Sequence, residues 1–397
     1  MRIALYHNLP PGGALRFLRE VVRRSSATHS YDLYRVVDPT GHIDTPDGVS
    51  ALIKSVNDIP YRWHWHSAPA RLVNVRNAIE LAALWDAEAR IARAIDAGGY
   101  DLCFVNSCRV THSPSLLTRL ETPTLYFAQE PRRQTFEREL RKTIYSASTH
   151  LRHKVLMHTE DALLAAADRR AAAAASVLAC NSIFSAETLY WAYARTARVV
   201  PLGVDTELFR PSGTSRDDYV LSVGALDPVK GFATIIEALG MLPAARRPAL
   251  KLAFERRRPG YDSCLLDLAK RQGVRLELCQ GVADAQLVNL YSSAIATVCA
   301  ARLEPFGLTP LESLSCGTPV VAINEGGYRE SVADGINGVL VAPTREGLAG
   351  GIDAVIAGRL TSDPGELRAS VGERTWDSTV ANLHRLFRTL PVAHSSV

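Results

Sequence analysis

Arg302-Leu-Glu-Pro-Phe-Gly-Leu-Thr-Pro-Leu-Glu-Ser-Leu-Ser-Cys-Gly-Thr-Pro-Val-Val-Ala322 is the stretch of this sequence that decides the fold. An apolar strand pattern precedes it and another, Pro319–Ile323, ends it, so a loop and a short helix at Pro310–Ser315 are predicted between two strands. Strand, loop, helix and strand form the repeating unit of a parallel α/β sheet, and open sheets of this kind bind ligands at the carboxyl ends of their strands. The stretch therefore predicts a fold class and also the edge of the sheet where a ligand would bind.

Two glutamates stand eight residues apart in this stretch. Glu304 belongs to the loop and Glu312 to the helix, and both can face the crevice at the sheet edge. Gly307 would let the backbone approach a ligand closely, and the amides at the helix start would face an anion. The carboxylates would accept hydrogen bonds from paired hydroxyls of a sugar or ribose. The residues alone leave open a plainer alternative, two surface glutamates of which one serves the helix N-terminus.

Short β-rich runs alternate with longer helical patterns on both sides of this stretch, which indicates parallel sheets covered on both faces. The sequence thus predicts two doubly wound α/β domains in tandem. Two prolines, Pro201 and Pro211, punctuate a linker, which sets the first domain at residues 1–199 and the second at 200–374, and a last helix at Thr375–Leu390 carries one apolar face. Predicted strands are Arg2–Tyr6, Asp101–Asn106, Thr124–Phe127, Ser176–Cys180, Tyr219–Val223, Ala249–Phe254, Arg275–Cys279, Ile295–Ala300, Pro319–Ile323 and Gly338–Val341. Further predicted helices are Arg71–Ala97, Asp161–Ala175, Gly231–Met241, Asp262–Gln272 and Asp284–Ser293.

The composition excludes several classes of protein. The 397 residues carry 45 Lys+Arg and 41 Asp+Glu, a formal net charge of +4, with 47% hydrophobic residues. These are globular proportions, and the charge is too small to indicate a nucleic-acid partner. Residues 1–200 hold 25 basic against 19 acidic side chains and residues 201–397 hold 20 against 22, so the first half suits an anionic ligand or membrane surface. Seven cysteines without a CxxC indicate a reducing cytoplasm, and neither a signal peptide nor a bilayer-spanning run is expected.

An ordered set of motifs resembles the retaining glycosyltransferases of family 4, which have the two-domain GT-B architecture. Glu304-Pro-Phe-Gly-Leu-Thr-Pro-Leu-Glu312, followed by Cys316-Gly-Thr-Pro-Val-Val321, is similar to their E-x7-E motif. The resemblance covers roughly residues 175–390 well. It implies two Rossmann-like domains facing across a cleft, with the helix Thr375–Leu390 returning to pack on the first domain. The other matching segments are Asn181–Thr188, Val200–Phe209, Val223–Gly231, Gly326–Ser331 and Asp334–Gly338.

The resemblance implies roles for residues of the second domain. Glu312 matches the glutamate that binds the ribose, Glu304 the one that faces the donor sugar, and Lys230 the lysine that contacts the diphosphate. A fixed cation there would stabilise the charge of the leaving nucleoside diphosphate, although a solvated loop lysine is the alternative. Residues that match the loop lining the sugar-diphosphate are Phe306, Gly307, Leu308 and Thr309.

Two departures from the family pattern affect the diphosphate site. Ala225 stands where relatives usually carry arginine, and Phe254-Glu-Arg-Arg-Arg-Pro-Gly260 replaces a Gly-Asp-Gly turn. We hypothesise that one of Arg256, Arg257 and Arg258 supplies the missing charge, with Arg256 assigned to the donor site. An exposed basic turn is the alternative.

The acceptor side is expected in the first domain. Gly12 and Gly13 resemble the family's glycine-rich loop, with a tight turn as the alternative. Gln129 and Glu130 stand where many relatives have a histidine near the reacting sugar, and Glu130 would assist proton removal unless Arg132 or Arg133 engages it. His112 follows another strand end and would line the same cleft, with a solvated loop histidine as the alternative.

Two other segments are unusual. Trp63-His64-Trp65-His66 places two histidines two residues apart but lacks an evident third metal ligand, so a loop with aromatics packed or lining a sugar site is favoured. The basic run Arg132–Lys154 would contact anionic lipid headgroups or form a solvated helix.

The resemblance implies an enzyme that moves a sugar from a nucleotide-diphosphate donor, such as a UDP- or GDP-sugar, to an acceptor hydroxyl with retained anomeric configuration. It implies no metal or other cofactor. Saccharide, lipid-linked and small-molecule acceptors stay open, as in glycan, glycolipid or cell-envelope polysaccharide synthesis, and a cytoplasmic enzyme with a peripheral contact at the inner face of the membrane is expected. Two alternatives stay open: a nucleotide-sugar epimerase of the same fold, and a non-catalytic sugar-nucleotide-binding protein. The absence of the usual arginine at Ala225 is the reason to retain the second.

Overall fold

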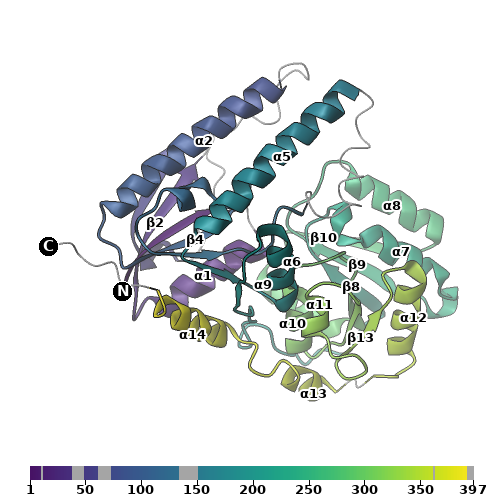
Figure 1. The fold of residues 1–397 in the computed structure, drawn as a ribbon. Coiled ribbons are helices and arrows are strands. Elements are labelled where there is room, and N and C mark those ends of the chain that lie inside the picture. Colours follow the sequence, from purple (N-terminus) through teal and green to yellow (C-terminus); the bar gives the residue numbers. More distant parts are fainter. Residues whose placement is uncertain (10–11, 38–48, 61–72, 134–150, 361–362, 391–397) are drawn as a thin grey trace. The chain divides into compact units, whose positions relative to one another are not determined.

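The computed structural model describes residues 1–9, 12–37, 49–60, 73–133, 151–360 and 363–390. Contacts divide the chain into two compact units (Figure 1). Unit 1 comprises Met1–Asn181, Ser185–Pro201 and the residues from Val380 onward, and unit 2 comprises Ser182–Phe184 and Leu202–Thr379. The sequence predicted the crossing at residues 199 and 200, and the contacts change unit between Pro201 and Leu202.

Unit 1 is built on a parallel sheet of seven strands in the order β3-β2-β1-β4-β5-β6-β7. The chain moves outward from β1 to β3, then returns to place β4 beside β1 and moves outward in the other direction. The carboxyl ends of β1 and β4 therefore flank the point where the strand order reverses, which is where such sheets bind ligands. The strands are β1 (Arg2–Asn8), β2 (Ser30–Val37), β3 (Ile53–Pro60), β4 (Leu102–Cys108), β5 (Thr124–Phe127), β6 (Val177–Cys180) and β7 (Arg198–Val199). The helices are α1 (Gly13–Ser25), α2 (Val73–Asp96), α5 (Leu151–Ala174), α6 (Ile183–Tyr193) and α14 (Trp376–Phe387), with 3-10 turns at Ser50–Leu52 and Ser115–Thr118.

Helices cover both faces of this sheet. On one face Phe17 of α1 stacks on Phe127, with ring centroids 4.3 Å apart, and meets Phe104 edge-on. Phe387 of α14 packs against Phe104 as well, at 5.5 Å, so the C-terminal helix completes this face. Because the central strands β1, β4 and β5 are buried on both sides, most of their residues are apolar.

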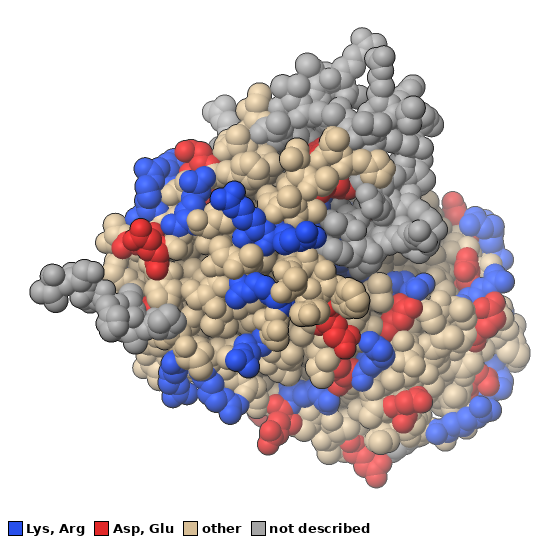
Figure 2. All heavy atoms as spheres, in the orientation of Figure 1, with Lys and Arg blue, Asp and Glu red and all other residues tan. Residues whose placement is uncertain are grey.

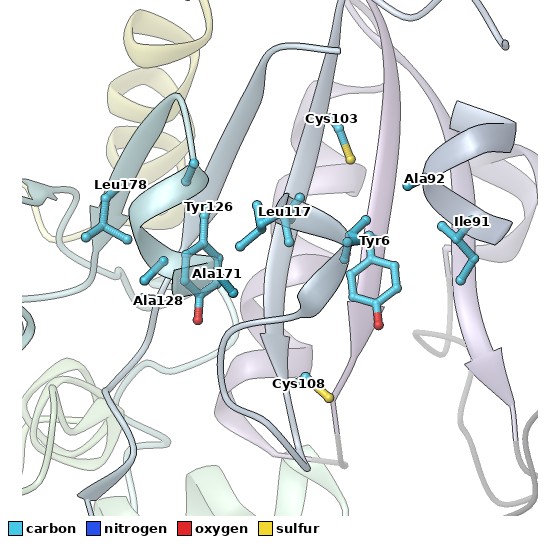
Figure 3. Packing of buried hydrophobic residues seen from close by; sticks show 14 of the residues in the cluster. Tyr6, Ile91, Ala92, Cys103, Cys108, Leu117, Tyr126, Ala128, Ala171 and Leu178 are labelled. Carbon is cyan, nitrogen blue, oxygen red and sulfur yellow. The ribbon is translucent and has the colours of Figure 1, made fainter. Parts of the chain in front are cut away.

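The opposite face forms a second apolar layer, shown in Figure 3. Tyr6 and Cys103 of the central strands lie there with Ile91 of α2, and Tyr126 lies beside Ala171 of α5. All five side chains are at most 1% exposed. This layer buries the alanine-rich side of α5, which explains why alanine suits that helix: small side chains let it approach the sheet.

Unit 2 has a parallel sheet of six strands in the order β10-β9-β8-β11-β12-β13. The strand order reverses between β8 and β11, so the loops that follow these two strands meet at one edge. The strands are β8 (Tyr219–Val223), β9 (Ala249–Phe254), β10 (Leu276–Gln280), β11 (Ala296–Cys299), β12 (Val320–Ile323) and β13 (Gly338–Val341). The helices are α7 (Phe232–Met241), α8 (Tyr261–Gln272), α9 (Asp284–Ser293), α10 (Leu308–Ser315), α11 (Tyr328–Ser331), α12 (Arg345–Ile356) and α13 (Pro364–Ala369), with 3-10 turns at Pro228–Lys230 and Ala244–Arg246.

The predicted doubly wound α/β architecture is confirmed in both units, but the sequence analysis missed α6, β7, α11, α12 and α13 as well as two strands near the N-terminus. It contained no strand at β2 or β3. In β2, Asp32 and Arg35 interrupt the apolar run, and β3 is a largely exposed edge strand with Lys54, Asn57 and Asp58. Polar residues hid both strands because Asp32 pairs with Arg2 and Arg35 pairs with Asp58.

Candidate functional site

Two loops build the site of unit 2 at the point where its strand order reverses. The loop after β8 ends in the 3-10 turn Pro228–Lys230, which begins where the Asp227 carboxylate accepts a hydrogen bond from the Val229 amide at 3.1 Å. The loop after β11 contains Glu304 and ends at α10. Asp227 thus fixes the turn that presents Lys230 toward the second loop.

An ion pair joins the two loops. Lys230 Nζ lies 2.8 Å from Glu304 Oε2, and the two side chains are 28% and 19% exposed. The Glu304 backbone is held in turn, since its carbonyl accepts a hydrogen bond from the Gly327 amide at 2.8 Å. A partly exposed pair of this kind is accessible to a ligand, and it offers a cation for phosphate next to a carboxylate for hydroxyls.

Glu312 lies deeper than Glu304. It sits on α10 with 5% exposure, and the buried Tyr291 hydroxyl of α9 donates a hydrogen bond to its Oε2 at 2.7 Å. The two glutamates that were expected to face one crevice thus differ in exposure: Glu304 is accessible, and Glu312 is largely covered. The sequence analysis missed Tyr291, although a tyrosine on the apolar side of a helix normally has a hydrogen-bond partner for its hydroxyl.

The backbone conformation at Gly307 and the close packing around it require a glycine, which the sequence analysis did not anticipate. Its φ is +84°, and a Cβ at this position would lie 2.6 Å from Cε1 of the Tyr328 ring. Gly307 therefore allows the loop to pack on α11, where the sequence analysis saw only space for a ligand. Next to it Phe306 is 5% exposed and belongs to the core, whereas Leu308 and Thr309 at the start of α10 are half-buried.

The arginine turn after β9 lies beside the loop that contains Ala225. The Arg256 carbonyl accepts a hydrogen bond from the Leu226 amide, and the Arg258 amide donates one to the Leu226 carbonyl. Arg257 is engaged by Asp262 at 2.7 Å, and all three arginines are exposed. The backbone thus brings the arginines next to the position of the missing charge, and the role of Arg256 at the diphosphate stays a prediction.

In unit 1 the residues predicted to form the acceptor side lie at the carboxyl ends of β1, β4 and β5. Gly12 and Gly13 are exposed where α1 begins. Gln129 accepts a hydrogen bond at Oε1 from Asn181 at 2.8 Å. Glu130 Oε2 lies 3.9 Å from Arg133 Nε, so the arginine contact that the sequence left open is present.

His112 is half-buried in the loop that follows β4. It occupies a left-handed backbone conformation with φ +59°, in a tight turn closed by two backbone hydrogen bonds with Cys108. Burial, with Arg132 as a second cause, lowers the pKa of His112 to about 4. The imidazole is therefore neutral at pH 7, and its role toward an acceptor stays a prediction.

Two buried carboxylates, which the sequence analysis missed, hold the loop around His112. Asp168 accepts hydrogen bonds from the Ser113 amide and the Tyr193 hydroxyl, both at 2.8 Å. Glu88 accepts hydrogen bonds from the Tyr6 hydroxyl and the Ser115 amide, both at 2.7 Å. Burial raises the pKa of both carboxyls. Their helical positions resemble ordinary solvated charges in the sequence, so only the tertiary structure identifies them.

The two unusual segments fall mainly outside the described residues: Trp63–His66 does so entirely, and most of Arg132–Lys154 does too. Arg132 itself is 7% exposed and pairs with Asp161 at 2.7 Å, so it is not available to a lipid surface. Within the described ranges no helix is long and apolar enough to cross a membrane. Figure 2 shows Lys and Arg predominating over much of unit 1 on the face drawn, and both signs interspersed over unit 2, in keeping with the charge difference between the two halves of the sequence.

Sequence comparisons connect unit 2 to a family. Residues 204–375 match the family described as glycosyl transferases group 1. A D-inositol 3-phosphate glycosyltransferase of Acidothermus cellulolyticus is 34% identical over 231 residues, which cover 50% of this chain and 49% of that protein. An MMP α-(1→4)-mannosyltransferase of Mycolicibacterium hassiacum is 31% identical over 174 residues, 43% of this chain and 41% of that protein. The chain thus spans about half the length of the curated relatives it matches.

Solved structures match over almost the whole chain. Sucrose-phosphate synthase of Thermosynechococcus elongatus superimposes with a TM-score of 0.74 at 19% identity, covering 98% of both chains. HepE of Anabaena, solved in complex with UDP and glucose, gives a TM-score of 0.69 at 19% identity, covering 98% of this chain and 100% of its own. At this identity the likeness establishes the fold, two Rossmann-like sheets of the GT-B type.

Proposed function

We propose that this chain, whose residues 204–375 match the glycosyl transferases group 1 family, is a glycosyltransferase that moves a sugar from a nucleotide-diphosphate donor to an acceptor hydroxyl. The observation that carries the proposal is the Lys230–Glu304 ion pair at the point of unit 2 where the strand order reverses. Glycosyltransferase names among the relatives support it, as does the UDP and glucose complex of the Anabaena protein. A UDP- or GDP-sugar is the proposed donor.

In the proposed reaction Lys230 acts on the diphosphate of the donor and Glu304 on its sugar. When the bond between the sugar and the diphosphate breaks, negative charge grows on the leaving phosphate, and the Lys230 ammonium stabilises it. Glu304 holds the ammonium in place at 2.8 Å and accepts hydrogen bonds from the sugar hydroxyls. Glu312, oriented by Tyr291, would accept hydrogen bonds from the ribose. In this proposal protein cations and amides balance the diphosphate without a metal ion.

Retention of the anomeric configuration follows from the family resemblance. The working mechanism is a displacement on the face from which the diphosphate leaves. The leaving phosphate oxygen accepts the proton of the acceptor hydroxyl as the new glycosidic bond forms. Glu304, the accessible carboxylate described at this sheet edge, is engaged by Lys230 at 2.8 Å, which favours this route over a covalent intermediate on Glu304.

Unit 1 is the proposed acceptor side. The neutral His112 imidazole and the Gln129 amide would bind hydroxyls there, and Glu130 would help to orient the reacting hydroxyl. Saccharide, lipid-linked and small-molecule acceptors all fit these polar groups, as in the synthesis of glycans, glycolipids or envelope polysaccharide. We propose a cytoplasmic enzyme with a peripheral contact at the inner face of the membrane.

A panel of nucleotide sugars tests the proposed activity. The purified full chain is incubated with each donor, with and without acceptor mixtures, and products are identified by mass spectrometry. Transfer of the sugar, or slow release of nucleoside diphosphate without acceptor, is the expected result. An isomerised nucleotide sugar would instead identify an epimerase, and binding without turnover a non-catalytic protein.

A further inference from the structure

Helix α6 carries aromatic side chains on both of its faces. Leu189, Ala192 and Tyr193 are buried against unit 1, which accounts for one apolar face. On the other face Tyr190 is 58% exposed and Trp191 is 82% exposed. Two adjacent aromatic side chains exposed on one helix are typical of an interaction surface.

The surroundings of these two aromatic residues are basic. Arg169 of α5 donates a hydrogen bond from Nε to the Ala192 carbonyl at 3.1 Å, which places its guanidinium beside the end of α6. Arg195 follows α6 and binds three carbonyls at the end of α5, those of Ala172, Ala173 and Ala175. Arg170 and Arg198 are exposed on the neighbouring α5 and β7. Against these four cations, Glu187 is the exposed carboxylate on α6 itself.

Aromatic side chains with arginines around them favour one class of partner. Tryptophan and tyrosine settle at the interface between headgroups and acyl chains, because their rings are apolar and their N–H or O–H stays hydrated. Arginines at the same level attract anionic headgroups. The charge of the patch therefore selects a negatively charged lipid surface over an uncharged one.

We propose that Tyr190 and Trp191, together with Arg169, Arg170, Arg195 and Arg198, form a surface of unit 1 that docks on anionic lipid bilayers. This gives the peripheral membrane contact of the proposed function a defined location. The docking is independent of the transfer reaction, since none of these residues belongs to the sites described above. Tyr190 and Trp191 are exposed, so substitutions of these two residues should leave the fold intact.

Vesicle flotation tests this surface without any substrate. The full chain is mixed with vesicles of phosphatidylcholine alone or with vesicles that also contain the anionic lipid phosphatidylglycerol. We expect binding to the anionic vesicles only, weakened by 0.5 M salt (on the order of a 4–5 Å screening length). The double variant Tyr190→Ala/Trp191→Ala should lower the partition coefficient by about tenfold or more.

A matched control uses another exposed apolar residue. Ile336 of unit 2 is 65% exposed, and Ile336→Ala should bind anionic vesicles like the wild type. A blue shift of the fluorescence on binding that Trp191→Phe abolishes would place Trp191 at the interface directly. The proposal is overturned if the wild type ignores anionic vesicles, as expected of a surface that meets a protein partner, or if the double variant binds undiminished. Because no donor or acceptor is present, either result leaves the transferase assay unaffected.

Discussion

Single residues of unit 2 show how the donor site is held together. The Lys230–Glu304 pair connects two loops that leave neighbouring strands, and the Gly327 amide fixes the Glu304 backbone. Gly307 permits the same loop to lie against Tyr328. The family resemblance predicted Lys230 and Glu304 from their motifs, because such motifs keep the chemistry at fixed spacing. It did not predict the roles of Tyr291 and Tyr328, because Tyr291 acts through a contact between two helices and Tyr328 through one with the loop at Gly307.

Replacing Gly307 tests this packing. Gly307→Ala forces a side chain into a left-handed conformation and against the Tyr328 ring, so the free energy of unfolding should fall by about 1–3 kcal/mol. Gly350 in α12 is the control, because an added Cβ meets nothing within 4 Å there. Gly350→Ala should instead stabilise the chain by about 0.5–1 kcal/mol. Equal effects of the two substitutions in urea unfolding would show that the Tyr328 contact does not matter.

His7 makes the stability of unit 1 depend on pH. Its side chain is fully buried at the end of β1, and burial, with Arg35 as a second cause, lowers its pKa to about 4 from 6.5. As the pH falls from 6.5 to 4, the unfolded chain binds a proton that the folded unit excludes, so the free energy of unfolding falls by up to about 3 kcal/mol from this residue. Above pH 6.5 the residue has no such effect.

The variant His7→Asn keeps a neutral polar group and removes this titration. Urea unfolding followed at several pH values should show that the variant loses less stability than the wild type between pH 6.5 and 4. If the two curves run parallel over that window, His7 is not buried in its neutral form.

Among the elements, α14 shows why a C-terminal helix has an apolar face. The sequence predicted Thr375–Leu390 from its helical spacing, and the structure has the helix at Trp376–Phe387. Its last turn packs on the sheet of unit 1 through Phe387 and Phe104. Periodicity predicted that this helix buries one face, and only the tertiary contacts show which strand it meets. By contrast, β2 and β3 were missed because their charges are paired within the sheet.

Removal of the Phe387 ring tests this contact. Phe387 is 1% exposed, so Phe387→Ala should lower the free energy of unfolding by about 3–5 kcal/mol. Arg385 lies on the exposed side of the same helix, and Arg385→Ala should change stability by less than about 0.5 kcal/mol. A small effect of Phe387→Ala in thermal or urea unfolding would mean that α14 does not complete the core of unit 1.

At the scale of the whole molecule, the chain repeats one architecture twice, and each sheet has its own reversal of strand order. The alternation of strands and helices was sufficient to predict this, with four strands matched residue for residue: Thr124–Phe127, Tyr219–Val223, Ala249–Phe254 and Gly338–Val341. Unit 2 was predicted more fully than unit 1 because its chemistry is concentrated in short motifs. In unit 1 the polar groups come from separate strands and helices, as Glu88 and Asp168 show.

Donor turnover by matched lysine variants is the measurement that tests the central claim most directly. Lys230 pairs with Glu304 at the proposed donor site. Lys251 of β9 pairs with Glu277 of β10 at 3.3 Å, in the sheet of the same unit but away from that site. With the donor identified by the panel, Lys230→Ala and Glu304→Ala should each lower kcat/KM by about 100- to 1000-fold. Lys251→Ala should stay near the wild-type value. Wild-type turnover in both Lys230→Ala and Glu304→Ala would contradict the assignment of this pair to the reaction.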